Sequence, residues 1–220
     1  MARKREFTFG IALLLIATLA FLFGWTNIFS VQDVSVSGSP NSQITKEVLR
    51  IADIKKGEKL ARIEPRTISA NLALAGIDWI EKVDISRNWI SRDVTIRISA
   101  RIPVAISGNK YVDQNGVLFT SPVALKSNLP TIQANNETAR LAAVEFYQSL
   151  PGDLRSELTS ISASSTKNFQ LVLQNSLHIN WGDSANNAVK IKIYKALIAL
   201  PENKKIQQMD VSDPTKPTVK

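Results

Sequence analysis

The first long pattern in the chain is an uncharged apolar segment close to its start. No charged residue occurs between Glu6 and Asp33, and residues 9–25 are almost wholly apolar. Because about 20 helical residues cross a hydrocarbon core of about 30 Å, the pattern predicts one transmembrane helix over residues 7–29. A cleaved signal peptide is the alternative. It is disfavoured because its apolar region is usually ~7–15 residues long, and because no A-x-A cleavage site follows here.

Basic residues on one side of this segment predict its orientation. Arg3, Lys4 and Arg5 precede it, and the far side has no comparable cluster. The positive-inside rule then makes residues 1–6 a cytoplasmic tail and exports everything after Ser30. We therefore expect a single-pass type II protein of the plasma or inner membrane, with its C-terminal part outside the cytoplasm.

The next seventy residues change between strand and helix periodicity. Residues 31–37 alternate as a strand, two helical stripes follow, and two further alternating segments come after Gly76. Val83 and Ile96 are expected to face inward, with Lys82 and Thr95 facing outward. The order is β-α-α-β-β, so both helices can cover one face of a three-stranded sheet. The helical stripes consist of Ile44, Val48 and Ile51, and of Ile68, Leu72 and Ala75.

The pattern changes at Arg101-Ile102-Pro103. Beyond this point, Asn115-Gly116 and Asn175-Ser176 each predict a hairpin turn between two strands. Helices are predicted over residues 138–150 and 184–200, and a last strand over residues 206–211. The fold class is therefore α+β: a transmembrane helix, a β-α-α-β-β domain at 31–100, a second, β-rich α+β domain at 101–211, and a flexible C-terminal tail at 212–220.

The last predicted helix has one apolar stripe and several lysines. The stripe recurs at helical spacing and is expected to face the core. The lysines are expected on or beside the face exposed to water. The stripe consists of Val189, Ile193, Ala196 and Leu200, and the lysines are Lys190, Lys192 and Lys195.

Composition excludes several kinds of chemistry. The chain has no cysteine, so a thiol nucleophile, a disulfide and a zinc–cysteine site are excluded. The single histidine, His178, alternates with apolar residues in a strand and is interpreted as an exposed strand residue rather than a general base. Asp113 and Asp183 lie at turns, where aspartate favours local hydrogen bonds. We expect no enzymatic activity, metal or cofactor.

The net charge is +8, and the excess of +6 that remains without Arg3, Lys4, Arg5 and Glu6 is spread along the chain. A solvated surface accounts for it, and attraction to anionic lipid heads or wall polymers is the alternative. No nucleic-acid partner is expected, because the folded part is predicted to lie outside the cytoplasm.

Several motifs resemble the bacterial cell-division family FtsQ/DivIB. They are Asp78-Trp79-Ile80, Asn88-Trp89-Ile90, Ala100-Arg101-Ile102-Pro103-Val104-Ala105 and Asp113-Gln114-Asn115-Gly116, after a short basic tail and one apolar helix. The motif residues that carry the resemblance most directly are Trp79, Trp89, Arg101 and Pro103. Asp78, Ile90 and Ala100 depart from the family pattern, which has proline at the first two positions and an acidic residue at the third. The resemblance implies a POTRA domain followed by an FtsQ-type β domain.

The resemblance also implies a function. It predicts a non-enzymatic scaffold of the division septum that binds FtsB and FtsL and acts through them on the wall synthases FtsW and FtsI. It places the FtsB site on the last strand, here Gln208, Met209, Asp210 and Val211, with Val219 beyond a proline-containing break. That strand comes late in the chain and is expected at the sheet edge, where a partner strand can be added.

Two other functions remain open from the sequence. A POTRA-bearing component of a transport or secretion system would repeat the module and end in a barrel, which this length does not accommodate. A membrane-anchored wall hydrolase would need a nucleophile and a base, and no motif places such a pair.

Overall fold

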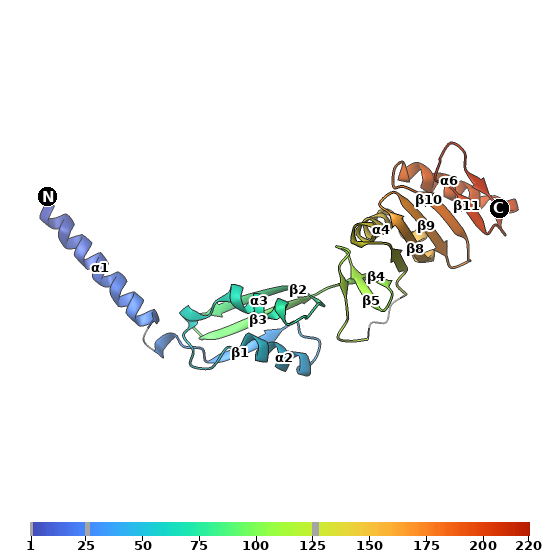
Figure 1. The fold of residues 1–220 in the computed structure, drawn as a ribbon. Coiled ribbons are helices and arrows are strands. Elements are labelled where there is room, and N and C mark those ends of the chain that lie inside the picture. The colour runs from blue at the N-terminus through green and yellow to red at the C-terminus, as the bar shows by residue number, and fades with distance from the viewer. Residues whose placement is uncertain (1, 25–26, 125–127) are drawn as a thin grey trace. The chain divides into compact units, whose positions relative to one another are not determined.

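The computed structural model describes the backbone of residues 2–24, 27–124 and 128–220. Side chains are described in the same ranges except for residues 2–8, 22–24 and 27. The chain divides into two compact units, residues 1–101 and 102–220, and each is described by itself (Figure 1).

The first element is a helix, α1 (Ala2–Gly24), followed by a short 3-10 turn at Asn27–Phe29. The helix begins within the expected tail at 1–6 and includes the basic triplet, and it ends at Gly24, before the expected end of the span at residue 29. Within the described residues, no helix combines the length and the apolar character needed to cross a membrane. Residues 25 and 26 of the expected span lie outside the described residues.

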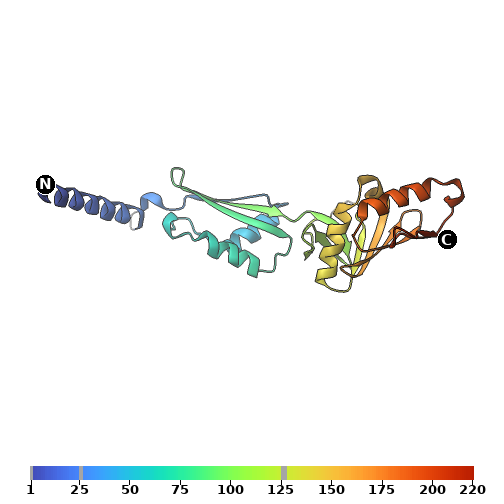
Figure 2. The same ribbon diagram turned by 90° about the horizontal axis from the view of Figure 1, so that it is seen from above.

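The rest of the first unit has the predicted β-α-α-β-β order. Its strands are β1 (Asp33–Ser37), β2 (Ile80–Asn88) and β3 (Asp93–Ala100), and its helices are α2 (Ser42–Ala52) and α3 (Pro65–Leu74), with a 3-10 turn at Leu60–Arg62. The strand order is β1-β3-β2, with β1 parallel and β2 antiparallel to the central β3. Both helices lie on one face of this sheet (Figure 2).

Local chemistry explains where these helices begin. The Asn41 side chain accepts a hydrogen bond from Ile44 N at the start of α2, and Pro65 occupies the first turn of α3. Ala75 was expected in the buried stripe of α3, but it lies after the last helical residue and is exposed.

The predicted strand register is confirmed. Val83 pairs with Ile98 and Ile85 with Ile96, while Lys82 is exposed. The central strand β3 buries its apolar alternate residues under the helices. The buried apolar residues of this unit include Val48, Leu60, Ile68, Leu72, Trp79, Val94, Ile96 and Ile98.

In the second unit, nine strands of the described residues form one mixed sheet in the order β12-β11-β10-β9-β8-β7-β4-β5-β6. These strands are β4 (Pro103–Ser107), β5 (Lys110–Asp113), β6 (Leu118–Phe119), β7 (Thr131–Ala134), β8 (Leu158–Ser165), β9 (Asn168–Leu173), β10 (His178–Gly182), β11 (Gln208–Asp210) and β12 (Thr218–Val219). The helices are α4 (Glu137–Ser149), α5 (Gly152–Glu157) and α6 (Asn187–Ala199), with a 3-10 turn at Pro201–Asn203. Both predicted hairpins are present, as β5–β6 and β9–β10.

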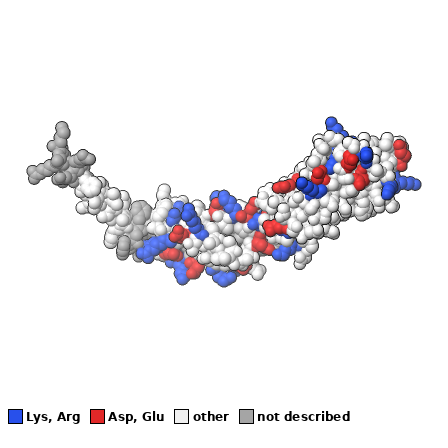
Figure 3. All heavy atoms as spheres, turned by 45° about the horizontal axis from the view of Figure 1, so that its top comes forward, with Lys and Arg blue, Asp and Glu red and all other residues white. Residues whose placement is uncertain are grey.

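The core of this unit lies between the sheet and its helices. Phe146 of α4 stacks on Phe169 of β9 with ring centroids 4.6 Å apart, and Trp181 of β10 packs on Phe146 at 5.7 Å. Alternate residues of β9, β10 and β11 face this core, so the other residues of these strands line the opposite face of the sheet. Figure 3 shows that acidic and basic side chains are interspersed over the visible surface of both units.

Candidate partner-binding edge of the second sheet

The predicted partner strand is not at the edge of the sheet. β11 pairs in parallel with β10 on one side and antiparallel with β12 on the other. Val211 is fully buried, and its N–H donates to Asn180 O at 2.9 Å. The expectation that Gln208–Val211 forms the edge is therefore wrong, because the following segment folds back and covers it.

Residues 212–220, the expected flexible tail, form a turn and a short strand that make hydrogen bonds. The Asp213 carboxylate accepts from the N–H and the hydroxyl of Thr215, and Lys216 N donates to Asp213 O. The hydrogen bond from Thr215 N lowers the pKa of Asp213. This turn reverses the chain so that Thr218 and Val219 form β12.

One residue of β12, Val219, directs its backbone N–H and C=O away from β11. Lys220 N donates to Gln208 O, and Gln208 N donates to Lys220 O, so these two residues form a hydrogen-bonded pair. The adjacent pair, Met209 with Val219, is then a non-hydrogen-bonded pair. The N–H and C=O of Val219 consequently point to the open side of the sheet. Its side chain is half-buried and packs against the core.

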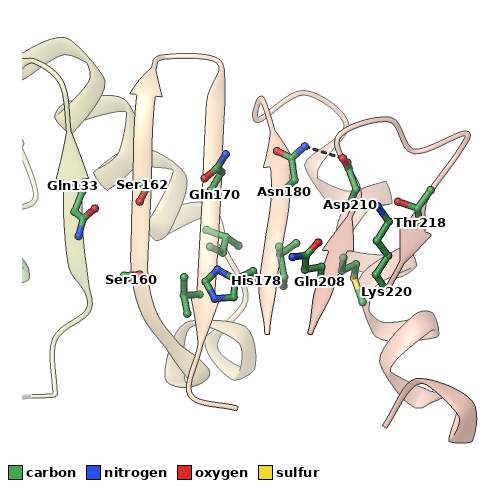
Figure 4. Close-up of a pocket in the computed structure, with 14 residues that line it drawn as sticks. Gln133, Ser160, Ser162, Gln170, His178, Asn180, Gln208, Asp210, Thr218 and Lys220 are labelled. Carbon is green, nitrogen blue, oxygen red and sulfur yellow. Dashed lines mark hydrogen bonds between the residues drawn. The ribbon is translucent and has the colours of Figure 1, made fainter. Parts of the chain in front are cut away.

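A polar surface adjoins this edge on the face of the sheet opposite the helices (Figure 4). A shallow depression of about 610 Å³ lies over strands β7 to β12. Strand register sets its residues in one row across the sheet, because each member pairs with the next. The row consists of Gln133, Ser162, Gln170, Asn180, Asp210 and Thr218.

Asp210 is the acidic member of this row. Its carboxylate accepts from Asn180 Nδ2 at 2.8 Å and from the N–H and hydroxyl of Ser212. Partial burial raises the pKa of Asp210, but the hydrogen bonds from Ser212 and Asn180 outweigh it, so the pKa lies below its ordinary value. The carboxylate therefore helps to hold β11 against β10.

His178 and Asp113, which the sequence analysis weighed as catalytic candidates, lie in a strand and in a turn. His178 is an exposed strand residue, as expected, with Val172 and Gln208 as its strand partners. The Asp113 carboxylate is buried and accepts from the N–H groups of Asn115 and Val117 in the β5–β6 turn. Within the described ranges, no group of three or more His, Cys, Asp or Glu residues could hold a metal ion.

Helix α6 buries a different face from the one expected. The Lys190 side chain is 1% exposed, whereas Val189 is 47% exposed, and Leu200 beyond the helix end is also exposed. The apolar stripe of Val189, Ile193, Ala196 and Leu200 is thus turned partly to solvent. Tyr194, with Ile191, Ile193 and Leu197, makes the inward contacts.

Lys190 is buried because its ammonium group has three oxygen acceptors. Nζ donates to Trp181 O and Asp183 O at 3.0 Å each, and to Asp183 Oδ1 at 3.1 Å. The hydrogen bond from Lys190 lowers the pKa of Asp183. The ammonium thereby joins α6 to the end of β10, the strand on which β11 is built. Sequence analysis missed this role because a lysine beside an apolar stripe looks like a solvated residue.

The four motif residues have identifiable contacts. Trp79 is buried, and its carbonyl accepts from Arg101 N at 2.8 Å. Arg101 Nε also donates to Asp78 O, which fixes the end of β3 on the segment before β2. Trp89 packs edge-on against Phe29, and Pro103 begins β4 opposite Asp113.

Two family profiles together match most of the chain. Residues 29–101 match the family profile described as POTRA domain, FtsQ-type, and residues 100–212 match the one described as cell division protein FtsQ/DivIB, C-terminal. The class is therefore a POTRA domain joined to an FtsQ/DivIB-type C-terminal domain. The chain belongs to the FtsQ/DivIB family of cell division proteins, which confirms the resemblance seen in the sequence.

Three similar proteins are each named cell division protein FtsQ. That of Mycolicibacterium smegmatis is 29% identical over 217 residues, covering 94% of this chain and 62% of the relative. That of Mycobacteroides abscessus is 28% identical over 212 residues, covering 92% and 65%, respectively. That of Streptomyces griseus is 26% identical over 190 residues, covering 79% and 89%. The chain thus spans less than two thirds of the length of the first two relatives.

Proposed function

We propose that this chain is a non-enzymatic scaffold of the division septum. It would bind FtsB- and FtsL-like membrane proteins outside the cytoplasm and so help to organise septal wall synthesis. Family membership supports the role in division. The proposed organisation is a cytoplasmic basic end, a membrane span within residues 7–29, a POTRA domain at 31–100 and a β domain from residue 101 that includes the returning strand β12.

The apolar surface of α1 supports the proposed anchor. Every large apolar side chain described in this helix is between 47% and 70% exposed: Phe9, Ile11, Leu13, Leu14, Leu15, Ile16, Leu19 and Phe21. A helix that is apolar on all sides is unfavourable in water and is stabilised by surrounding hydrocarbon. A shared membrane would also hold the chain and its partners in one plane and raise their effective concentration.

The observation that carries the proposed binding site is the edge strand β12. Val219 directs its N–H and C=O away from β11, and a partner strand can complete these bonds by extending the sheet. Main-chain pairing would provide affinity, while contacts of alternate side chains would provide specificity.

A proline substitution at the edge tests this site. Val219→Pro removes the outward N–H without removing a hydrogen bond to β11. We expect the second unit to stay folded by circular dichroism while an FtsB-like partner no longer co-purifies with the full chain. Val219→Ala is the matched control for the side chain and is expected to retain most of the partner.

Two other results would count against strand addition. Full partner recovery with folded Val219→Pro protein would exclude β12 as the binding edge. An equal loss with Val219→Ala would assign the binding to the side chain. Val211→Pro is expected to unfold the second unit, because it removes the bond to Asn180 O inside the sheet.

Reporter fusions test the proposed topology. Arg3, Lys4 and Arg5 lie before the apolar segment, so the N-terminal side is expected in the cytoplasm. A reporter active outside the cytoplasm, fused after Lys220, is expected to be active. Activity limited to a cytoplasmic reporter at that position would refute the topology.

A further inference from the structure

The turn between β2 and β3 carries an isoleucine that is almost completely exposed. Ile90 is 95% exposed, the largest fraction among the large apolar side chains of the described residues. The turn is held in shape, because Ile90 N and Ser91 N both donate to Asn88 Oδ1, at 3.0 and 3.2 Å. Arg92 closes it in the left-handed conformation, with φ of 64°. An ordered turn therefore presents Ile90 to its surroundings.

The first residue of this turn, Trp89, packs against an aromatic ring and an arginine. Trp89 packs edge-on against Phe29 with ring centroids 5.9 Å apart, and the Arg87 guanidinium lies 5.8 Å from the centre of the Trp89 ring. Arg87 Nη1 is fixed by Leu60 O and Ile63 O. Tryptophan with a neighbouring cation is typical of side chains at the boundary between water and lipid.

The turn lies at the end of the first unit where the chain arrives from α1. Gln32 N donates to Arg92 O at 2.8 Å, and β1 and β3 start side by side at Asp33 and Asp93. Phe29 is five residues after Gly24, the last residue of α1. At no more than ~3.6 Å per residue, Phe29 lies within about 18 Å of the helix end.

We propose that the β2–β3 turn, residues 89–92, inserts Ile90 and Trp89 into the interfacial layer of the membrane that anchors α1. This inference rests on the proposed anchor. The occupant is lipid because the short connection confines the turn to the neighbourhood of the bilayer surface. Ile28, which is also exposed, adds apolar area at the same end. The contact would hold the POTRA domain against the membrane instead of leaving it free on its connection.

The absence of cysteine from the chain allows a direct test with single labelled sites. Ser91→Cys carries an environment-sensitive fluorophore beside an intact Ile90, in the full chain reconstituted in phosphatidylcholine vesicles with brominated acyl chains. We expect a blue shift and quenching by bromines placed near the surface of the bilayer. Neutral lipid excludes attraction between basic residues and anionic headgroups as the cause.

Two further labelled sites serve as controls. Leu74→Cys is matched in exposure, since Leu74 is 84% exposed, but it precedes β2 at the opposite end of the sheet. The nine residues of β2 separate the two ends by about 30 Å at ~3.3 Å per residue, so no quenching is expected there. Leu14→Cys reports on the anchor and is expected to be quenched by bromines deep in the bilayer.

The outcomes separate the two proposals. Quenching at residue 91 that is lost on adding Ile90→Asp, with residue 14 still quenched, supports insertion of the turn. A residue 91 label as exposed as the residue 74 label, with residue 14 quenched, overturns the inference and leaves the anchor standing. An unquenched residue 14 label overturns the anchor and the inference together. Quenching at residue 91 that survives Ile90→Asp also overturns the inference, because the fluorophore would then be the inserting group.

Discussion

Replacing Lys190 by methionine tests the buried ammonium group in the second unit. Methionine has a similar volume and flexibility, so the change removes the charge and the donors with little change in packing. Trp181 O and Asp183 O both lose their bond from Nζ, and Trp181 is fully buried. Each buried acceptor left without a donor costs about 1–3 kcal/mol.

The expected total is about 2–4 kcal/mol in the free energy of unfolding of the second unit. It lies below the ~3–5 kcal/mol typical of breaking a fully buried ion pair, because the Asp183 side chain is 44% exposed and water can replace part of its interaction. The assay is native-state hydrogen exchange of β9 and β10 amides in the full chain. At ~1.4 kcal/mol for each factor of ten, exchange would become roughly 30- to 700-fold faster.

Two variants make this prediction refutable. Lys192→Met changes an exposed lysine of the same helix and is expected to alter stability by no more than ~0.5 kcal/mol. Asp183→Asn keeps both carbonyl acceptors bonded to Lys190, so it is expected to destabilise the second unit less than Lys190→Met does. If Lys190→Met and Lys192→Met exchanged at equal rates, the buried hydrogen bonds of Lys190 would not stabilise the fold.

Three further predictions concern the strands and turns. Ile96→Ala is expected to destabilise the first unit by about 2–4 kcal/mol through lost burial and a cavity, whereas Thr95→Ala is expected to change its stability little. Thermal unfolding in which Thr95→Ala was the more destabilising variant would contradict the register. Gly182→Ala places a Cβ 2.9 Å from Ser212 Cβ at φ of +71°. It is expected to lower the stability in urea unfolding more than Gly108→Ala, where φ is also positive but an added Cβ has no atom beyond its chain neighbours within 4 Å. The pKa of Asp210 is lowered in the folded state, so the ionised carboxylate stabilises the fold. This stabilisation is complete at pH values above the ordinary pKa near 4, and it is lost as the pH falls through the folded-state pKa. The stability difference between wild type and Asp210→Asn is therefore expected at pH 7 and to shrink in acid, and a difference that grew in acid would show the sign to be wrong.

The sequence by itself determined the elements whose signals are local. Alternation in β2 and β3 fixes the register of the POTRA sheet, because a shift by one residue would expose Ile96 and Ile98. The Asn115-Gly116 turn and the Pro65 helix start likewise depend on the φ preferences of single residues. These features need no distant contact, and the structure has them where the pattern predicts them.

Tertiary structure alone decided which strand forms the edge of the second sheet and which face of α6 is buried. β12 has two residues and no readable alternation, and it exists because Lys220 pairs with Gln208 after a turn at Asp213. Lys190 is buried because Trp181 and Asp183, brought beside it by the end of β10, provide its acceptors. In both cases the deciding partner comes from another segment of the chain. A short polar strand or a lysine has no inward preference of its own until hydrogen-bond partners surround it.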